Sequence, residues 1–208
     1  CFVIWFFRRN ETTFLWFSIS CLFCVLFIWN VISREVFPYP NSLWVMKANL
    51  TYFVLYSVCF SIYLLRFVKV KFAELEKTLF LVAAVCIVTI LFIPSLMVKT
   101  VFAIIFLLCI ALFLASFLFV VYRANKTKRR DYILLAVCLS VVCIVMMYDV
   151  SLLFDERIND HQPLSPYTSP IITFFIVIIL ATRLDKNIKK IQRFNNELEQ
   201  RVNFVTSN

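Results

Sequence analysis

The sequence predicts an all-α fold: a polytopic transmembrane helix bundle that continues into a C-terminal cytoplasmic coiled-coil helix. Of the 208 residues, 62% are hydrophobic and only 16% are charged, which is too little polar surface to cover a soluble domain of this size. The apolar residues gather in stretches of about 20, the length of helix that crosses a bilayer. Glycine is absent, which excludes the nucleotide-binding loops that depend on it.

Six segments are long and apolar enough to span a bilayer, and a shorter one precedes them. The six complete spans are predicted at residues 13–32, 48–67, 78–93, 99–122, 132–154 and 170–184. Residues 1–7 are wholly apolar and are followed at once by Arg8 and Arg9. We therefore expect residues 1–7 to be the remnant of a first helix that begins before the sequence given, which makes seven spans in the whole protein.

The basic residues predict how the spans are oriented. Because successive spans alternate in direction, 17 of the 21 lysines and arginines fall on one side of the membrane, the exceptions being Arg34, Lys47, Lys99 and Arg157. Cytoplasmic loops carry the excess of positive charge. We therefore expect the N-terminal side outside and the C-terminus in the cytoplasm. The net charge of +9 then reflects topology and attraction to the lipid bilayer, and not nucleic-acid binding.

After residue 184 the composition turns polar, while apolar residues recur at the heptad spacing of a coiled coil. The predicted seam consists of Leu184, Ile188, Ile191, Asn195, Leu198, Val202 and Val205. β-Branched residues and an asparagine at one core position, with leucine at the other, favour a parallel two-stranded coil and hence a homodimer. The alternative is a single amphipathic helix on the inner membrane surface, held there by its lysines and arginines.

Asp149 is the ionisable residue that the sequence singles out within a span. It follows sixteen residues without a charge, lies beside Tyr148 and falls near the predicted outer end of its span. An ionisable group in a membrane is costly and is taken as functional by default. Asp149 and Tyr148 are therefore candidates for intramembrane sensing or for a polar contact between helices. The alternative is that Asp149 marks the outer boundary, because Asp155 and Glu156 follow closely.

No pattern of catalytic, cofactor-binding or metal-ligating residues is found. The eight cysteines lie in apolar spans, and none has a histidine or a second close pair at zinc spacing. Cys21 and Cys24 have the spacing of a redox motif, but burial in hydrocarbon keeps a thiol unreactive. His161 is expected in a solvated outer loop. We therefore expect no cofactor, no metal and no enzymatic activity within these 208 residues.

Several short stretches occur in the order found in a known family. They are Arg8-Arg9, the aromatic run at 14–17, Tyr148-Asp149, Leu-Ser-Pro-Tyr at 164–167, Ala-Thr-Arg-Leu at 181–184 and Phe-Asn-Asn-Glu-Leu-Glu-Gln-Arg-Val at 194–202. In these stretches the chain resembles the bacterial seven-transmembrane receptors with diverse intracellular signalling modules. It departs from them in lacking glycine, including after Tyr167, where Thr168 stands.

The resemblance implies a division into two parts. Residues 1–184 would form a seven-helix sensor domain in a bacterial cytoplasmic membrane. Residues 185–208 would be a linker, the start of a coiled coil that leads to a histidine kinase or nucleotide cyclase. In that family a ligand-binding domain outside the membrane precedes the helices, so the resemblance implies missing parts at both ends of this chain.

Two hypotheses of different classes follow. The first is a membrane receptor core that transmits an extracytoplasmic signal through its last helix and a parallel coiled coil to a cytoplasmic signalling module. The second is a transporter or channel-like membrane module in which Asp149 is the intramembrane functional carboxylate and the C-terminal helix is only an assembly or surface element. A membrane enzyme would need a catalytic group that the sequence does not contain.

Overall fold

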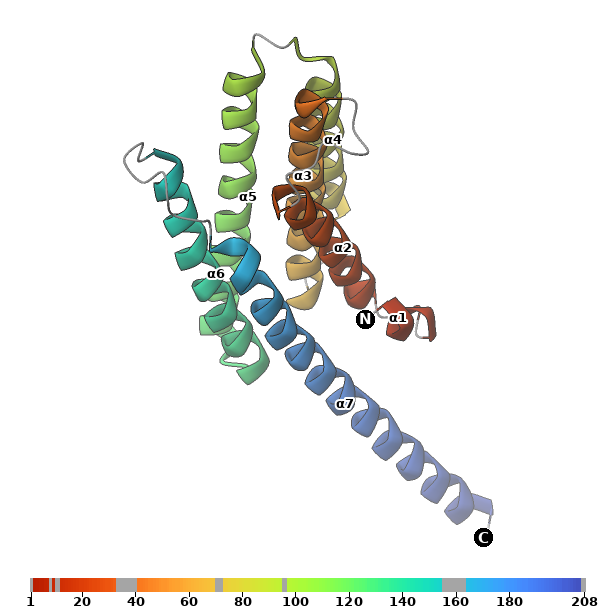
Figure 1. Cartoon of the computed structure of the whole chain (residues 1–208). Helices are drawn as coiled ribbons and strands as arrows, with labels where there is room; N and C mark the ends of the chain where they lie inside the picture. Colours follow the sequence, from red (N-terminus) through yellow and green to blue (C-terminus); the bar gives the residue numbers. More distant parts are fainter. Residues whose placement is uncertain are drawn as a thin grey trace.

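The structure, a computed structural model, describes residues 2–7, 9, 12–32, 41–69, 73–94, 97–154 and 164–206. Within these ranges the regular elements are helices (Figure 1). They are α1 (Phe2–Phe7), α2 (Thr12–Ile32), α3 (Ser42–Phe67), α4 (Ala73–Phe92), α5 (Val98–Thr127), α6 (Arg130–Phe154) and α7 (Ser165–Thr206). The predicted all-α fold is confirmed. His161 and the acidic pair at 155 and 156 lie outside the described residues.

Six helices, α2 to α7, are long and apolar enough to cross a membrane, which confirms the six predicted spans. Several helices extend beyond the predicted apolar stretch because polar residues continue the helix at its ends. At the start of α3, for example, the side-chain oxygen of Asn41 accepts a hydrogen bond from the backbone N–H of Trp44 at 3.1 Å. This bond caps the first turn of the helix. The last helix begins at Ser165, five residues before the predicted start, and contains Pro170 in its second turn.

Helix α3 is the centre of the bundle. Two-thirds of its apolar window is buried (67%), whereas the other five spans bury between 11% and 22%. It packs against α2, α4 and α5, and α6 joins α5 to α7. Helix α7 packs mainly on α6 and touches α2 more lightly. The last helix therefore lies at the edge of the bundle and is held on few sides.

The chain contains no glycine, and serines occupy the contact between α3 and α5 instead. The hydroxyl of Ser116 on α5 donates to the hydroxyl of Ser61 on α3 at 3.1 Å, and Ser61 donates to the backbone carbonyl of Ser57 at 2.8 Å. All three serines are buried. Small side chains let membrane helices approach closely, and a hydrogen bond between helices adds to the contact.

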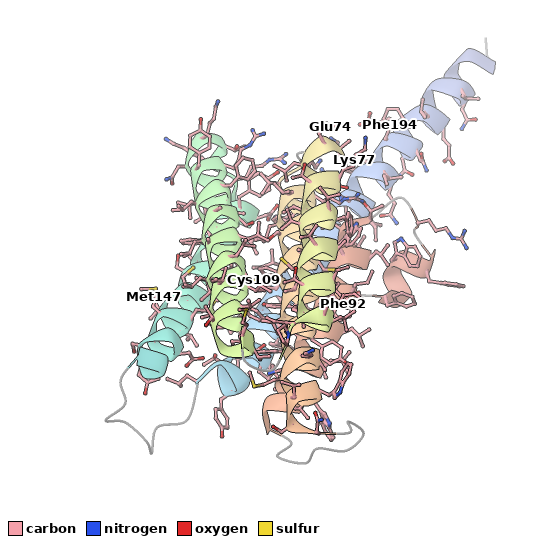
Figure 2. All side chains as sticks on the ribbon, turned by 90° about the horizontal axis from the view of Figure 1, so that it is seen from above. Glu74, Lys77, Phe92, Cys109, Met147 and Phe194 are labelled. Carbon is pink, nitrogen blue, oxygen red and sulfur yellow. The ribbon has the colours of Figure 1, made fainter. Side chains whose placement is uncertain are left out.

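The two ends of the bundle differ in charge. One end, which we call the basic end, is formed where α3 and α5 finish, where α4 and α6 begin and where α7 emerges. The described lysines and arginines at this end include Arg66, Lys69, Lys77, Arg123, Lys126, Lys128, Arg129, Arg130, Arg183 and Lys186. Figure 2 shows Glu74 and Lys77 at this end and Met147 toward the opposite end. Helix α7 projects far beyond the basic end (Figure 1).

Two tight turns at the basic end use lysine in a left-handed conformation. Lys69 after α3 has φ 60°, and Lys128 between α5 and α6 has φ 50°. The backbone N–H of Lys128 bonds to the carbonyl of Ala124 and so closes α5. Glycine usually fills such positions because it has no Cβ to clash. In the absence of glycine, lysine provides these helix ends at some cost in backbone strain.

Candidate functional site

The candidate site is the place where α7 leaves the bundle at the basic end. Arg183 of α7 donates through Nη1 to the backbone carbonyl of Phe67 at 2.7 Å. Its guanidinium carbon also lies 4.4 Å from the centre of the Phe67 ring. Phe67 is the last residue of α3, and the final carbonyls of a helix lack partners and form the negative end of its dipole. The arginine therefore satisfies the end of the central helix.

A second contact holds α7 three residues further on. Lys186 Nζ lies 2.7 Å from Asp131 Oδ1 in an ion pair. Asp131 is in the first turn of α6, where a carboxylate also interacts favourably with the helix dipole. The pair is partly exposed, so alone it stabilises by less than about 1 kcal/mol. Together, the Arg183–Phe67 and Lys186–Asp131 contacts, which we call the exit contacts, attach α7 to α3 and to α6 at one level.

An arginine–glutamate pair joins α3 to α4 at the basic end. Arg66 of α3 donates through Nε and Nη2 to the two carboxylate oxygens of Glu76 on α4, at 3.0 and 2.7 Å. The two side chains are only 21% and 18% exposed. The Arg66 guanidinium also lies 5.5 Å from the ring centre of Trp16 on α2. Such a bidentate pair is both strong and directional, so it holds α3 to α4 beside α2 at this end of the bundle.

Tyr63 lies just inside the exit contacts and is fully buried. Its ring centre lies 5.9 Å from that of Phe67 and 5.0 Å from that of Phe17 on α2. Its hydroxyl has no hydrogen-bond partner within the described part of the chain. A buried polar group without a partner costs about 1–3 kcal/mol. The sequence reasoning missed Tyr63, because a tyrosine within an apolar span looks like any other core aromatic residue.

Asp149 lies at the opposite end and contacts the start of α7. Its Oδ1 accepts the backbone N–H of Leu164 at 2.8 Å. The carbonyl of Leu164 in turn accepts hydrogen bonds from the N–H groups of Tyr167 and Thr168. These bonds form the first turn of α7. Of the uses considered for Asp149, this geometry supports a polar contact between α6 and α7. The neighbouring Tyr148 is 37% exposed and is not brought to α7 by any described contact.

Replacing Asp149 with leucine is expected to raise amide hydrogen exchange at residues 164–168 about fivefold, because one hydrogen bond of about 1 kcal/mol is lost. Hydrogen exchange followed by mass spectrometry in lipid nanodiscs measures it. Asp149→Asn keeps an acceptor oxygen and should stay near wild type, as should Ser151→Ala at the same end of α6. Equal exchange in Asp149→Leu and wild type would show that this contact does not hold α7.

Most of the predicted seam lies on the projecting part of α7, whereas Leu184, its first residue, packs against the buried core of the bundle. Ile188 is half-buried, whereas Asn195 is exposed, as are Ile191 at 52%, Leu198 at 44% and Val202 at 58%. Val205 is within the helix, but its side chain lies outside the described set. Phe194, next to the seam, is also exposed at 60% and lies on the projecting part of α7 (Figure 2). The coiled coil itself remains a prediction.

The cysteines form no reactive or metal site among the described residues. The seven that are described are free, and no group of three metal-ligating side chains occurs in the described ranges. Cys24 does not turn toward a redox partner: its sulfur lies 3.3 Å from the hydroxyl of Ser169. That contact joins α2 to the start of α7, so Cys24 helps to place the last helix.

A small hollow at the opposite end is lined by Lys47 and apolar side chains of α3, α4 and α5. Lys47 is buried and donates through Nζ to the carbonyls of Leu91 and Ile93, at 2.9 and 3.1 Å, where α4 ends. The hollow holds about 10 Å³, roughly the room that one water molecule needs. Lys47 therefore joins α3 to the end of α4, and the hollow does not offer a place for a ligand.

The fold and its contacts define a class of protein: an integral membrane helix bundle whose last helix leaves it as a long rod. The chain belongs to the family described as 7TM diverse intracellular signalling, whose model matches residues 1–184. This match confirms the resemblance drawn from the sequence and identifies the chain as a multi-pass membrane protein of receptor type. Neither the search of curated proteins nor that of solved structures found a match.

Proposed function

We propose that the chain is a receptor core that passes an extracytoplasmic signal through α7 to a signalling module in the cytoplasm, of histidine kinase or nucleotide cyclase type. The observation that carries this proposal is the continuity of α7. It is one helix from Ser165 to Thr206, which contacts α6 and α2 inside the bundle and projects beyond the basic end. A shift, tilt or rotation of a helix within a bundle moves its far end as well.

The charge distribution supports this orientation of the receptor. Ten of the described lysines and arginines lie at the basic end, which favours its placement on the cytoplasmic side. The projecting part of α7 would then lie in the cytoplasm of a bacterium, beyond its inner membrane. The outer loops, or a ligand-binding domain preceding the helices, would receive the signal. The chain itself would transmit and would not catalyse.

The exposed seam supports a homodimer as the transmitting form. A helix with apolar residues at heptad spacing buries them by pairing with a second copy. Asn195 at a core position favours the parallel, in-register pair, because each asparagine can then bond its counterpart. In a parallel dimer both copies of α7 reach the output modules at the same level, which is what a dimeric kinase or cyclase would need.

A fusion of the full chain, at Asn208, to a reporter that is active only as a dimer tests this proposal in bacterial membranes. The unmodified chain should be active. Leu198→Lys should lower the activity at least about tenfold, because a lysine in the seam prevents close pairing. Gln200→Lys, on the outer face of the same turn, should leave it unchanged. Asn195→Leu should change the activity of the reporter, because the register between the two paired helices is no longer specified.

Two results would contradict the proposal. One is an inactive reporter with the unmodified chain, although the fusion reaches the membrane at normal levels. The other is equal activity of Leu198→Lys and Gln200→Lys, which would mean that α7 does not pair through the seam. In that case α7 would lie as a single amphipathic helix on the membrane surface.

A further inference from the structure

Arg183 has two acceptors available on α3 and uses only one of them. It bonds the backbone carbonyl of Phe67 at 2.7 Å. The hydroxyl of Tyr63, four residues earlier on α3, has no hydrogen-bond partner within the described residues. Since α3 and α7 both run toward the basic end, Tyr63 lies about one helical turn, or about 5.4 Å, closer to the opposite end than Phe67 does.

Arg183 and Tyr63 both lie beside the ring of Phe67. The Arg183 guanidinium lies 4.4 Å from the ring centre of Phe67, which is itself 5.9 Å from that of Tyr63. Ile179, one turn before Arg183 on α7, belongs to the same buried cluster as Tyr63. An arginine side chain is long, so a shift of α7 smaller than one turn is enough.

Each of two positions of α7 would pair polar groups that the other position leaves unpaired. In the present arrangement the exit contacts are formed, while the Tyr63 hydroxyl is buried and unsatisfied, which destabilises it. With α7 shifted toward the opposite end, Arg183 would satisfy that hydroxyl, but Lys186 would move away from Asp131. Packed helix interfaces tend to have discrete arrangements instead of sliding continuously. Two positions of similar free energy are the condition for a switch that a weak signal can bias.

We propose that Tyr63 is the second docking position for Arg183, so that α7 has two axial positions, one in which Arg183 bonds Phe67 and one in which it bonds Tyr63. This inference rests on the proposed function, because it assigns the regulation of the same helix. The Lys186–Asp131 pair stabilises the first position, and the Tyr63 hydroxyl stabilises the second.

Distances between spin labels test the proposal in the full chain. Labels are attached to a ketone-bearing amino acid introduced at Lys69 and Lys190, both exposed, so that the native cysteines are retained. Labelled protein in lipid nanodiscs is diluted with unlabelled protein, which removes distances between copies. Asp131→Asn should raise the population with the shifted distance, by up to about 5 Å, at least about threefold over the unmodified chain.

Adding Tyr63→Phe to Asp131→Asn should abolish this gain, because phenylalanine keeps the ring and loses only the hydroxyl. Tyr122→Phe, which removes the hydroxyl of an exposed tyrosine on α5, is the matched control and should leave the gain intact. A gain that persists with Tyr63→Phe would overturn the proposal, as would a single unshifted distance in Asp131→Asn. The measurement is intramolecular, so it does not depend on whether the seam forms a dimer, and the reporter test can fail or succeed separately.

Discussion

Arg183→Met is expected to raise amide hydrogen exchange at residues 180–186 about tenfold, because α7 loses a charge-assisted hydrogen bond and a cation–π contact worth roughly 1.5 kcal/mol together. Methionine keeps much of the apolar stem and removes the guanidinium that bonds Phe67 and covers its ring. Hydrogen exchange by mass spectrometry in nanodiscs measures the effect by segment. The increase should be confined to the exit of α7 and leave α3 and α5 protected.

Two further variants separate charge from geometry at this position. Arg183→Lys keeps the positive charge but not the planar fork of donors, so its exchange should fall between that of wild type and Arg183→Met. Arg193→Met removes an exposed arginine from the projecting part of α7 and should leave residues 180–186 unchanged. If Arg183→Met exchanged at the wild-type rate, the arginine would not hold the last helix.

Arg66→Met is expected to lower the free energy of unfolding by about 3 kcal/mol, because it leaves the carboxylate of Glu76 mostly buried without its partner. The expected cost is large since the pair is bidentate and both side chains are about four-fifths covered. Unfolding by sodium dodecyl sulfate in mixed micelles, followed by tryptophan fluorescence, measures it.

The double variant Arg66→Met with Glu76→Met should be less destabilised than Arg66→Met alone, because no unpaired charge then remains. Lys77→Met provides the control on α4, the helix that carries Glu76. Lys77 pairs with Glu74 at 3.1 Å, but those side chains are 74% and 87% exposed, so the loss should be below about 1 kcal/mol. Equal losses for Arg66→Met and Lys77→Met would mean that burial does not strengthen the Arg66 pair.

The spans were predictable because membrane thickness sets a length that the sequence displays directly. Each predicted span falls largely within one helix, and the differences are at the ends, where capping groups such as Asn41 and tight turns such as that at Lys128 decide the boundary. Helix α7 begins five residues before the predicted span, at Ser165. In the structure, proline is accommodated within the second turn, where it removes one backbone hydrogen bond.

The exit contacts were not predictable from the sequence, for a physical reason. Arg183, Lys186 and Arg66 all lie at span ends, where basic residues are expected for topology alone, so their number predicts orientation but not their partners. Phe67 and Arg183 are 116 residues apart, and only the fold brings them together. Asp149 was singled out because a charge in an apolar span is unusual, whereas its partner, a backbone N–H, has no sequence signature.

The two left-handed lysines link backbone strain to membrane topology. Lys69 and Lys128 are among the positive charges that mark the basic end, and they are also the residues that bend the chain there. Glycine at either position would relieve the strain but would delete one of the charges that are expected to orient the neighbouring helices during insertion. The folded state and the insertion step therefore favour different residues at the same two positions. In this chain lysine occupies both positions, so both charges are kept and the folded protein carries the backbone strain.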